Sequence, residues 1–369
     1  PSVMGIFTYL LVVVIGAIWV VYFTGNELLT FAALIAVGMY SLPYLADVGS
    51  LLETDRLTAL FFAFIFSTLF FATNIVSIIK RTSAEAQQAQ VVTAIATGVY
   101  LTSWIYVAAR EEFHSLLFVC WALVFALGSY LVYLASSYRV PFYIYAGISL
   151  GFIGAATAAE LDGYVLVITY SIQVMALVMA ANVLLRRAQL GEALSWLFVV
   201  PVALSLEYFV SPAWRDGVIH GEFFALTAVA LTLLIAALSY WFPAQQTSNI
   251  QAHDREVTPE ALLTIAGSTY LLIIYWLVLH VLFVDDVATM IALISYTIIG
   301  LVLYIPGQIK DSATIKSTGA ILLAFVVLRL LFVDVWQMEL TGRILTFFAI
   351  GVLLISTAFI NRTHQIPKT

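Results

Sequence analysis

The chain has 369 residues, of which 63% are hydrophobic and 10% are charged, and its formal net charge is -6. Soluble domains are about 45–50% apolar and about 25% charged, so this composition excludes an ordinary water-soluble domain. The negative net charge, without a basic stripe in the sequence, argues against nucleic acid as a partner. The only cysteine, Cys120, lies inside an apolar run, which excludes intramolecular disulfides and cysteine-based metal sites.

Long apolar runs, separated by short polar breaks, predict about thirteen transmembrane helices, each near the length of about 20 residues that crosses a bilayer. The runs are too long and too uniformly apolar for the strands of a membrane barrel. No basic n-region or cleavage signature accompanies the first run, so we interpret it as a mature helix and not as a signal peptide. The expected fold is all-α, a polytopic integral membrane helical bundle arranged largely as hairpins. The predicted spans are 4–23, 28–46, 57–79, 91–109, 113–135, 140–159, 163–185, 193–210, 221–242, 261–283, 287–306, 313–333 and 342–360.

The polar breaks alternate between basic and acidic along the chain. Because Lys and Arg resist translocation, we expect the basic breaks in the cytoplasm, with the N-terminus outside and the C-terminus inside. The basic breaks contain Lys80, Arg81, Arg139, Arg186, Arg187, Arg255, Lys310 and Lys316. The acidic breaks contain Asp47, Glu53, Asp55, Glu111, Glu112, Glu160, Asp162, Asp216, Glu222, Asp285, Asp286, Asp334 and Glu339.

The polar segment 243–260 predicts a division of the chain. It separates residues 1–242, a membrane domain of about nine helices, from residues 261–369, a C-terminal membrane region of about four helices. We expect the segment itself to be a cytoplasmic linker. Where it ends, Thr258 and Pro259 have the pattern of an N-cap followed by proline at the first helical position.

Small residues recur every four positions in the span 140–159, at Gly147, Gly151, Ala155 and Ala159. Such a stripe lets helix backbones approach closely in a bilayer, so we predict helix packing along it and expect this helix to be the most enclosed of the bundle. The same stretch, from Gly147 to Gly151, also matches the G-x-S-x-G pattern of hydrolases. That pattern needs a strand–turn–helix context, which a mid-span position does not supply, so packing is the favoured interpretation.

Arg329, Asp334, Glu339 and Arg343 form the most specific group of ionisable residues. An arginine at membrane depth costs a few kcal/mol, so Arg329 needs a carboxylate partner or an interfacial position. Glu339 and Arg343 are spaced to pair along one helix. We favour an ion-pair latch that fixes the last hairpin; the alternative is an external anionic-ligand site built on the two arginines.

Glu207 and His280 lie near the outer ends of their spans. Each is a candidate for proton handling in an outward-open cavity, because an ionisable group within a membrane is a functional hypothesis by default. We favour an interfacial position, where a polar tip reaches water at little cost. Asn74, Gln173 and Asn182 are polar residues inside spans, for which we expect interhelical hydrogen bonds.

The C-terminal run 328–362 has a basic residue near a span end, then Phe-Val-Asp, a short tip, Gly-Arg-Ile-Leu-x-Phe and a glycine-containing last span. In this region the chain resembles the uncharacterised bacterial multi-pass proteins catalogued as domain of unknown function 2339. Members are typically longer, so the resemblance implies a short relative; it supports the architecture and implies no activity. The matching residues are Arg329, Asp334, Arg343, Phe347 and Gly351.

We expect a multi-pass protein of the bacterial cytoplasmic (inner) membrane, a non-enzymatic subunit or accessory protein of an envelope-associated complex. Its expected partners are the lipid bilayer and other membrane proteins. The alternative is a carrier for a small anionic or lipid-like substrate, and a third hypothesis is a membrane-embedded transferase acting on a lipid-linked substrate. No phosphate-binding glycine loop, H-E-x-x-H or haem-attachment motif occurs, so we expect no cofactor and no metal.

Overall fold

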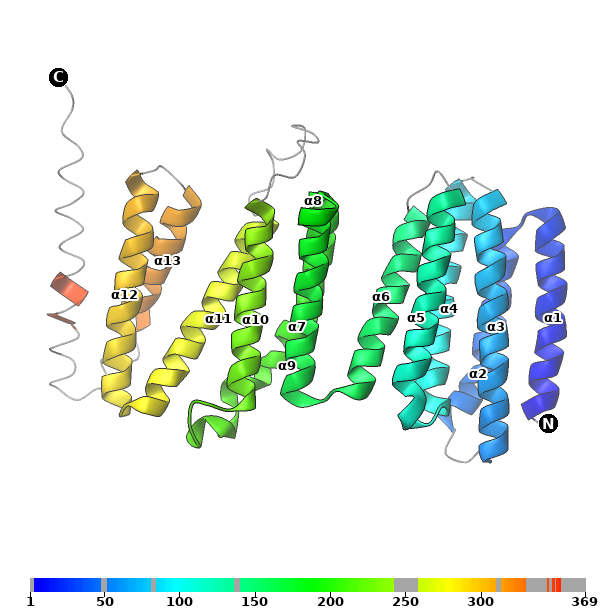
Figure 1. Ribbon diagram of the computed structural model, residues 1–369, viewed down its shortest axis with the longest axis horizontal. Coiled ribbons are helices and arrows are strands. Elements are labelled where there is room, and N and C mark those ends of the chain that lie inside the picture. Colours follow the sequence, from blue (N-terminus) through cyan, green and yellow to red (C-terminus); the bar gives the residue numbers. More distant parts are fainter. Residues whose placement is uncertain are drawn as a thin grey trace, which may run out of the picture. The chain divides into compact units, whose positions relative to one another are not determined.

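The computed structural model describes residues 3–47, 52–80, 84–135, 140–241, 258–309 and 313–329, together with 344, 347–348 and 350–352. Within these residues the chain is helical, and no strand occurs (Figure 1). Eleven of the described helices are long and apolar enough to cross a membrane. The architecture is therefore that of a polytopic, all-α membrane protein.

The chain divides into two compact units, Pro1–Asp162 and Gly163–Thr369. The first unit contains α1 (Val3–Thr24), α2 (Glu27–Ala46), α3 (Glu53–Lys80), α4 (Ala84–Ala108), α5 (Glu111–Ala135) and α6 (Val140–Glu160). The second contains α7 (Gly163–Met179), η2 (Ala180–Leu184), α8 (Ala188–Ser195), η3 (Trp196–Phe198), α9 (Val199–Ser205), η4 (Leu206–Val210), η5 (Pro212–Arg215), α10 (Gly221–Leu238), η6 (Ser239–Trp241), α11 (Pro259–Leu282), α12 (Asp285–Ile309) and α13 (Ala313–Arg329).

The first twelve predicted spans each coincide with a helix or, for 193–210, with a chain of short helices. The helix α13 has 17 residues, and its apolar part, Gly319–Arg329, is shorter than the eleven candidate spans. The thirteenth predicted span, 342–360, lies mostly outside the described residues, although 350–352 are helical. A count of thirteen spans and the sidedness of the chain stay predictions.

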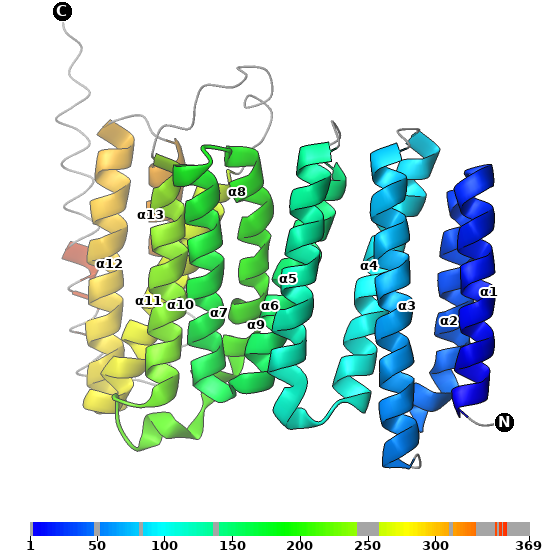
Figure 2. The same cartoon turned by 45° about the vertical axis from the view of Figure 1, so that its right-hand side comes forward.

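The boundary between the units differs from the predicted division at 243–260. The helices on the two sides of that segment, α10 and α11, pack against each other and lie side by side in Figures 1 and 2. Leu233 of α10 and Tyr270 of α11 belong to one buried apolar cluster. A polar segment marks a break in the chain, but it does not prevent the helices on either side from sharing a core. Residues 242–257 themselves lie outside the described part.

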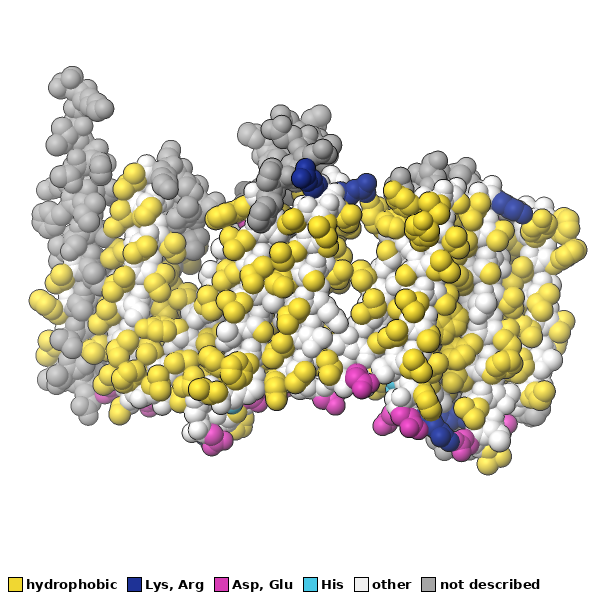
Figure 3. All heavy atoms as spheres, viewed as in Figure 1, with side chains coloured by type: hydrophobic (Ala, Val, Ile, Leu, Met, Phe, Trp, Pro, Cys, Tyr) yellow, Lys and Arg dark blue, Asp and Glu magenta, His cyan; other side chains and the backbone are white. Residues whose placement is uncertain are grey.

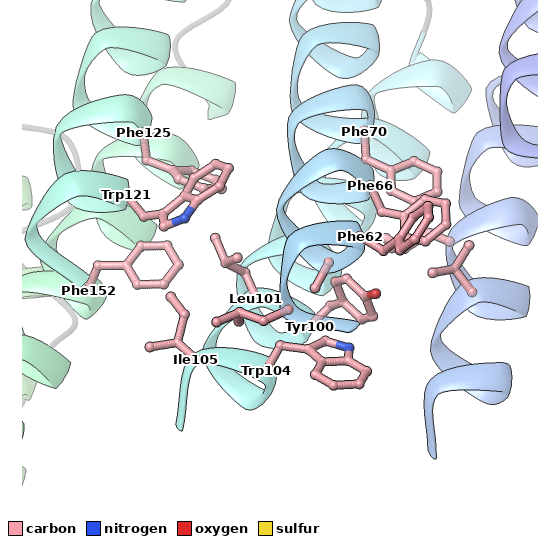
Figure 4. Packing of buried hydrophobic residues seen from close by; sticks show 14 of the residues in the cluster. Phe62, Phe66, Phe70, Tyr100, Leu101, Trp104, Ile105, Trp121, Phe125 and Phe152 are labelled. Carbon is pink, nitrogen blue, oxygen red and sulfur yellow. The ribbon is translucent and has the colours of Figure 1, made fainter. Parts of the chain in front are cut away.

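The core of the first unit is aromatic, and Figure 4 shows part of it. Phe62, Phe66 and Phe70 follow one face of α3 at helical spacing, and the Phe7 ring lies 6.0 Å from the Trp104 ring, centroid to centroid. Aromatic pairs at such distances contribute about 0.5–1.5 kcal/mol beyond the area that they bury. In a bilayer, where lipid is as apolar as leucine, this close packing holds the helices together.

In the second unit, the span after α7 is irregular. The helix α7 continues into a π-helical turn, η2, and the next crossing is made of α8, η3, α9 and η4 in succession (Figure 2). Pro201 lies inside this crossing and cannot donate a backbone hydrogen bond, which favours a break in regular α-helix. Such interruptions are frequent at functional sites.

Helix entries follow the expected capping chemistry. Thr258 accepts a hydrogen bond from the backbone nitrogen of Ala261 at 3.3 Å, and Pro259 occupies the first turn of α11. The predicted N-cap is confirmed. At the start of α2, Asn26 Oδ1 accepts from the backbone nitrogen of Leu28 at 3.2 Å. These caps satisfy amide groups that have no partner within the helix.

Within each unit, most described acidic side chains lie at the same end of the helices (Figure 3). In the first unit this is where α3 and α5 begin and α6 ends; in the second it is where α10 and α12 begin. Lys80 ends α3 at the opposite side of the first unit, and Arg186 and Arg187 follow η2 at the opposite side of the second. The alternation seen in the sequence thus becomes two differently charged ends of each helix bundle.

Candidate functional site

Arg329, Trp276 and His280 lie together where α11 and α13 end. The guanidinium carbon of Arg329 is 3.6 Å from the centroid of the Trp276 ring. The centroid of the His280 ring is 4.1 Å from that of Trp276, and the two planes are inclined by 32°. All three side chains are half-buried. A cation over an indole contributes about 0.5–1 kcal/mol when exposed and about 2 kcal/mol or more when desolvated. Two of the residues predicted as candidates, Arg329 and His280, therefore share one aromatic partner.

The imidazole of His280 bridges α11 and α12. Its Nδ1 lies 2.9 Å from the carbonyl oxygen of Trp276, and its Nε2 lies 3.3 Å from Oγ1 of Thr289. Because a carbonyl oxygen can only accept, we assign the hydrogen of the neutral ring to Nδ1. Nε2 then accepts from the Thr289 hydroxyl, and it donates to the same hydroxyl when the ring is charged. The ring keeps both partners in either state.

Two tyrosines fix the helices that carry this cluster. Tyr296 Oη of α12 donates to the carbonyl oxygen of Leu272 at 2.6 Å, and Tyr275 Oη lies 2.9 Å from Ser295 Oγ. Both bonds join α11 to α12 beside Trp276. Hydrogen bonds between membrane helices contribute on average about 0.6 kcal/mol each, and at most about 1.7 kcal/mol. The cluster therefore lies on two helices, α11 and α12, that are joined by hydrogen bonds.

The cluster combines a guanidinium, an imidazole and a hydroxyl at one end of the membrane helices. Such groups stabilise anions such as phosphate or carboxylate through charge-assisted hydrogen bonds. Asp285 and Asp286 begin α12 at the same end and oppose the approach of an anion. Among the described residues, no group of three or more His, Cys, Asp or Glu side chains is placed to hold a metal ion.

The other predicted members of this constellation are placed differently. Asp334, Glu339 and Arg343 lie outside the described residues, so the ion-pair latch stays a prediction. Glu207 is exposed on η4, and the contacts found in the described part of the chain do not join it to His280. The interfacial role that we favoured for Glu207 stays a prediction.

The small-residue stripe on α6 does not form the packing face that we predicted. A Cβ atom added at Gly147 or Gly151 would meet nothing within 4 Å among the described atoms, and Ala159 is exposed while Ala155 is half-buried. The buried face of α6 carries Pro141, Tyr145, Ser149, Phe152 and Ala156 instead. Bulky side chains fill the contact, and four-residue spacing of small residues alone does not say which face is buried.

The close approach on this side of the first unit occurs at Gly98 of α4. A Cβ atom there would lie 3.0 Å from Cγ2 of Ile148 on α6.

The helix α6 is also not the most enclosed helix, as we had expected. In the most apolar stretch of α3, 50% of the residues are buried, against 22% in that of α6. Ser149 donates to the carbonyl oxygen of Ala122 at 2.8 Å, which is an interhelical bond and agrees with the packing interpretation of the G-x-S-x-G stretch.

A buried polar network joins three helices of the first unit. Asn74 Nδ2 donates to the backbone oxygen of Gln90 at 2.8 Å and to Tyr145 Oη at 3.0 Å. Gln90 Nε2 donates to Ser77 Oγ at 2.7 Å. The expected interhelical bonding of Asn74 is confirmed. Because hydrocarbon offers no partner, these groups specify how α3, α4 and α6 pack.

Asn182 forms a corresponding contact in the second unit. Its Nδ2 donates to Ser239 Oγ at 2.8 Å, which joins η2 to η6 and confirms the predicted interhelical bond. Its Oδ1 lies against Gly191 of α8, where an added Cβ would be only 2.0 Å away. A side chain at position 191 would therefore force Asn182 or α8 to shift.

The acidic end of the first unit carries an ion pair. Arg110 pairs with Glu53, and its Nη1 lies 3.9 Å from Glu112 Oε1. The hydrogen bond and charge of Glu53 raise the pKa of Arg110. Exposed pairs of this kind contribute little to stability. Arg56 donates from Nε to the carbonyl oxygen of Ala108 at 2.9 Å and so satisfies the end of α4.

Sequence reasoning missed Trp276 and Thr289. The four-residue spacing of Trp276 and His280 places both on one helix face and was an available signal. Thr289 had none, because its role depends on how α12 is placed against α11.

Comparison with family models, with curated proteins and with solved structures finds no match to this chain.

Proposed function

We propose that this protein is a non-enzymatic integral membrane subunit or accessory protein of a bacterial envelope-associated complex in the cytoplasmic membrane. The proposal includes a sidedness: the acidic helix ends lie in the periplasm and the basic ends in the cytoplasm, as the distribution of Lys and Arg favours. It also includes the C-terminal resemblance to the proteins of domain of unknown function 2339, which rests on a segment mostly outside the described residues.

One observation carries the proposal. In the described part of the chain, every Asp, Glu, Lys, Arg and His lies in a connecting segment, in a short helix, or within the first or last turn of its long helix. Ion-coupled carriers place titratable groups deep in the membrane as proton or ion relays. A chain whose described ionisable groups all lie at helix ends is better suited to holding a position in the membrane and binding other proteins.

The buried polar residues support the same role. Asn74, Gln90 and Asn182 use their amides to bond other helices, and Ser205 Oγ lies 2.8 Å from Tyr270 Oη between α9 and α11. These groups therefore form hydrogen bonds that hold helices together. A substrate pathway would instead have to offer such groups to a ligand.

The test is crosslinking in intact membranes of cells that carry a tagged chain at its native level. After solubilisation and denaturing purification through the tag, we expect crosslinked species well above 40.6 kDa, with the same partner proteins at a fixed ratio in repeated preparations. An unrelated polytopic protein with the same tag is the control. Recovery of the chain only at its own mass, or with partners shared with the control, would contradict the proposal.

A carrier for a small anionic substrate is the second candidate, and the Arg329–Trp276–His280 cluster favours it. Inorganic phosphate is a suitable probe because it presents the anionic oxygens that such a cluster binds. The carrier hypothesis predicts that phosphate raises the melting temperature of the purified chain and that Arg329→Gln abolishes this shift. If phosphate and chloride at equal ionic strength give the same melting temperature in both variants, the carrier hypothesis loses its support.

A further inference from the structure

The segment that joins α9 to α10 is fastened to the second unit by His220. This residue has extended backbone geometry and is the N-cap of α10. Its Nδ1 accepts a hydrogen bond from the backbone nitrogen of Phe223 at 2.9 Å. Asn, Asp, Ser and Thr usually occupy this position, because their side-chain oxygen accepts from an amide of the first helical turn. That oxygen accepts throughout the neutral pH range. An imidazole accepts only while it is neutral.

The bond to Phe223 also determines where the proton of the neutral ring lies. Because Nδ1 accepts, the hydrogen must be on Nε2. Nε2 is buried and has no hydrogen-bond partner among the described residues. The Trp214 ring lies against the imidazole, with centroids 4.5 Å apart and planes at 80°. Among the described residues, the imidazole thus makes one hydrogen bond, the cap itself, and one aromatic contact, with Trp214.

We infer that His220 is a pH-sensitive fastener of the segment 206–220, which is closed at neutral pH and loosened as the pH falls. Protonation puts a hydrogen on Nδ1, so the bond to the Phe223 amide is lost. It also places a positive charge at the N-terminus of α10, where the helix dipole is unfavourable to cations. Both effects weaken the cap when the ring is protonated.

The rest of the segment is arranged so that release has a structural consequence. Trp214 Nε1 donates to the carbonyl oxygen of Tyr208 at 2.8 Å, and both side chains are buried in the apolar cluster of the second unit. Ser211 donates to Glu222 Oε2 at 2.8 Å and forms a second link to α10. When the ring leaves Trp214, the indole loses part of its cover, and the segment keeps the serine link and its ring contacts, Phe209 with Tyr270 and Trp214 with Phe223.

Other charged groups lie on the elements around His220, and they bear on the pH range of the test. Glu222 is in the first turn of α10, and α11, whose His280 bonds Trp276 and Thr289, packs against η4 and η5. Ordinary carboxylates titrate near pH 4, so a comparison between pH 5.5 and pH 7.5 addresses histidine. The helix α7 also packs against α10, with Tyr164 next to Gly221. The titratable or charged side chains on or beside these elements are Tyr164, Tyr170, Glu207, Tyr208, Arg215, Asp216, Glu222, Glu260, Tyr270, Tyr275 and His280.

The test is hydrogen exchange of the full chain in lipid nanodiscs at pH 5.5 and 7.5, with labelling times scaled to the intrinsic exchange rates. We expect the protection factor of the Phe223 amide to be about fivefold lower at pH 5.5 than at pH 7.5. This factor corresponds to the free energy that an ordinary N-cap contributes. Asn caps without titrating in this range, so His220→Asn should stay protected at both pH values. Ile219→Asn, at an exposed neighbouring position, is the matched control and should behave like the unmodified chain.

Equal protection of the unmodified chain at both pH values would overturn the inference. So would the same acid-induced loss in His220→Asn, because the titrating group would then lie elsewhere. A second measurement does not depend on that variant folding. Loss of the imidazole changes the surroundings of the Trp214 indole, so acidification should change the fluorescence of the unmodified chain more than that of Trp214→Phe. An identical acid response of these two chains would also contradict the fastener.

Discussion

The guanidinium carbon of Arg329 lies 3.6 Å from the centroid of the Trp276 ring, so the last residue of α13 is held by an aromatic side chain of α11. The same indole contacts His280, which in turn bonds Thr289 of α12. One tryptophan thus connects the ends of three helices. Three predictions test these and similar contacts through the stability of the chain.

The contact between Arg329 and Trp276 should appear as an energetic coupling. We expect Arg329→Gln and Trp276→Leu each to destabilise the chain, and the double variant to cost less than the sum by about 0.5–2 kcal/mol. The measurement is reversible denaturant unfolding in micelles. Trp241→Leu, at an exposed position, is the control and should show no coupling with Arg329→Gln. Strict additivity for Trp276 would show that the contact carries no energy.

Gly191 should be far less tolerant of alanine than Gly147. A Cβ at position 191 would overlap Asn182 Oδ1, so Gly191→Ala should cost about 1–3 kcal/mol, as overpacking usually does. At Gly147 nothing lies within 4 Å, and alanine should be neutral or stabilise α6 by up to about 1 kcal/mol through helix propensity. Thermal melting of the two variants checks this, and equal melting temperatures would refute the close contact.

Removing the amide of Asn74 should destabilise the first unit more than removing the hydroxyl of Tyr145. Asn74→Leu leaves the Gln90 carbonyl and the Tyr145 hydroxyl without their donor, at a cost of about 1–3 kcal/mol. Tyr145→Phe removes one of the two acceptors and should cost about 0.5–1.5 kcal/mol. Unfolding free energies of the two variants provide the comparison. If the order is reversed, the amide is not the centre of the network.

The helices themselves were predictable from the sequence, because a bilayer requires long apolar runs whatever the helices contact. The broken crossing from α8 to η4 was not, since Pro201 and Gly191 sit inside a run that is apolar enough for one regular helix. The boundary of the compact units, between Asp162 and Gly163, was not predicted for a related reason. The polar residues of 243–260 indicate a connection between two helices, whereas the boundary of a compact unit depends on which helices share a core.

The candidate site was predictable in part. Arg329 and His280 were found because ionisable residues are rare in apolar spans and therefore conspicuous. Their common neighbour, Trp276, depends on the packing of α13 beside α11, which periodicity within one helix does not encode. The stripe on α6 failed because spacing identifies a smooth face, while burial of Tyr145 and Phe152 is decided by the partner helix. His220 lies in a short polar segment, where sequence offers no sign of a cap.

The most direct test of the account is the sidedness of single cysteines in intact cells, after replacement of Cys120 by alanine. With the acidic ends in the periplasm, a membrane-impermeant maleimide should label Ile219→Cys, an 82% exposed position beside His220. It should leave Glu85→Cys, which follows the basic end of α3, unlabelled until the cells are opened. Labelling of position 85 from outside, with position 219 protected, would reverse the orientation and contradict the proposed placement in the membrane.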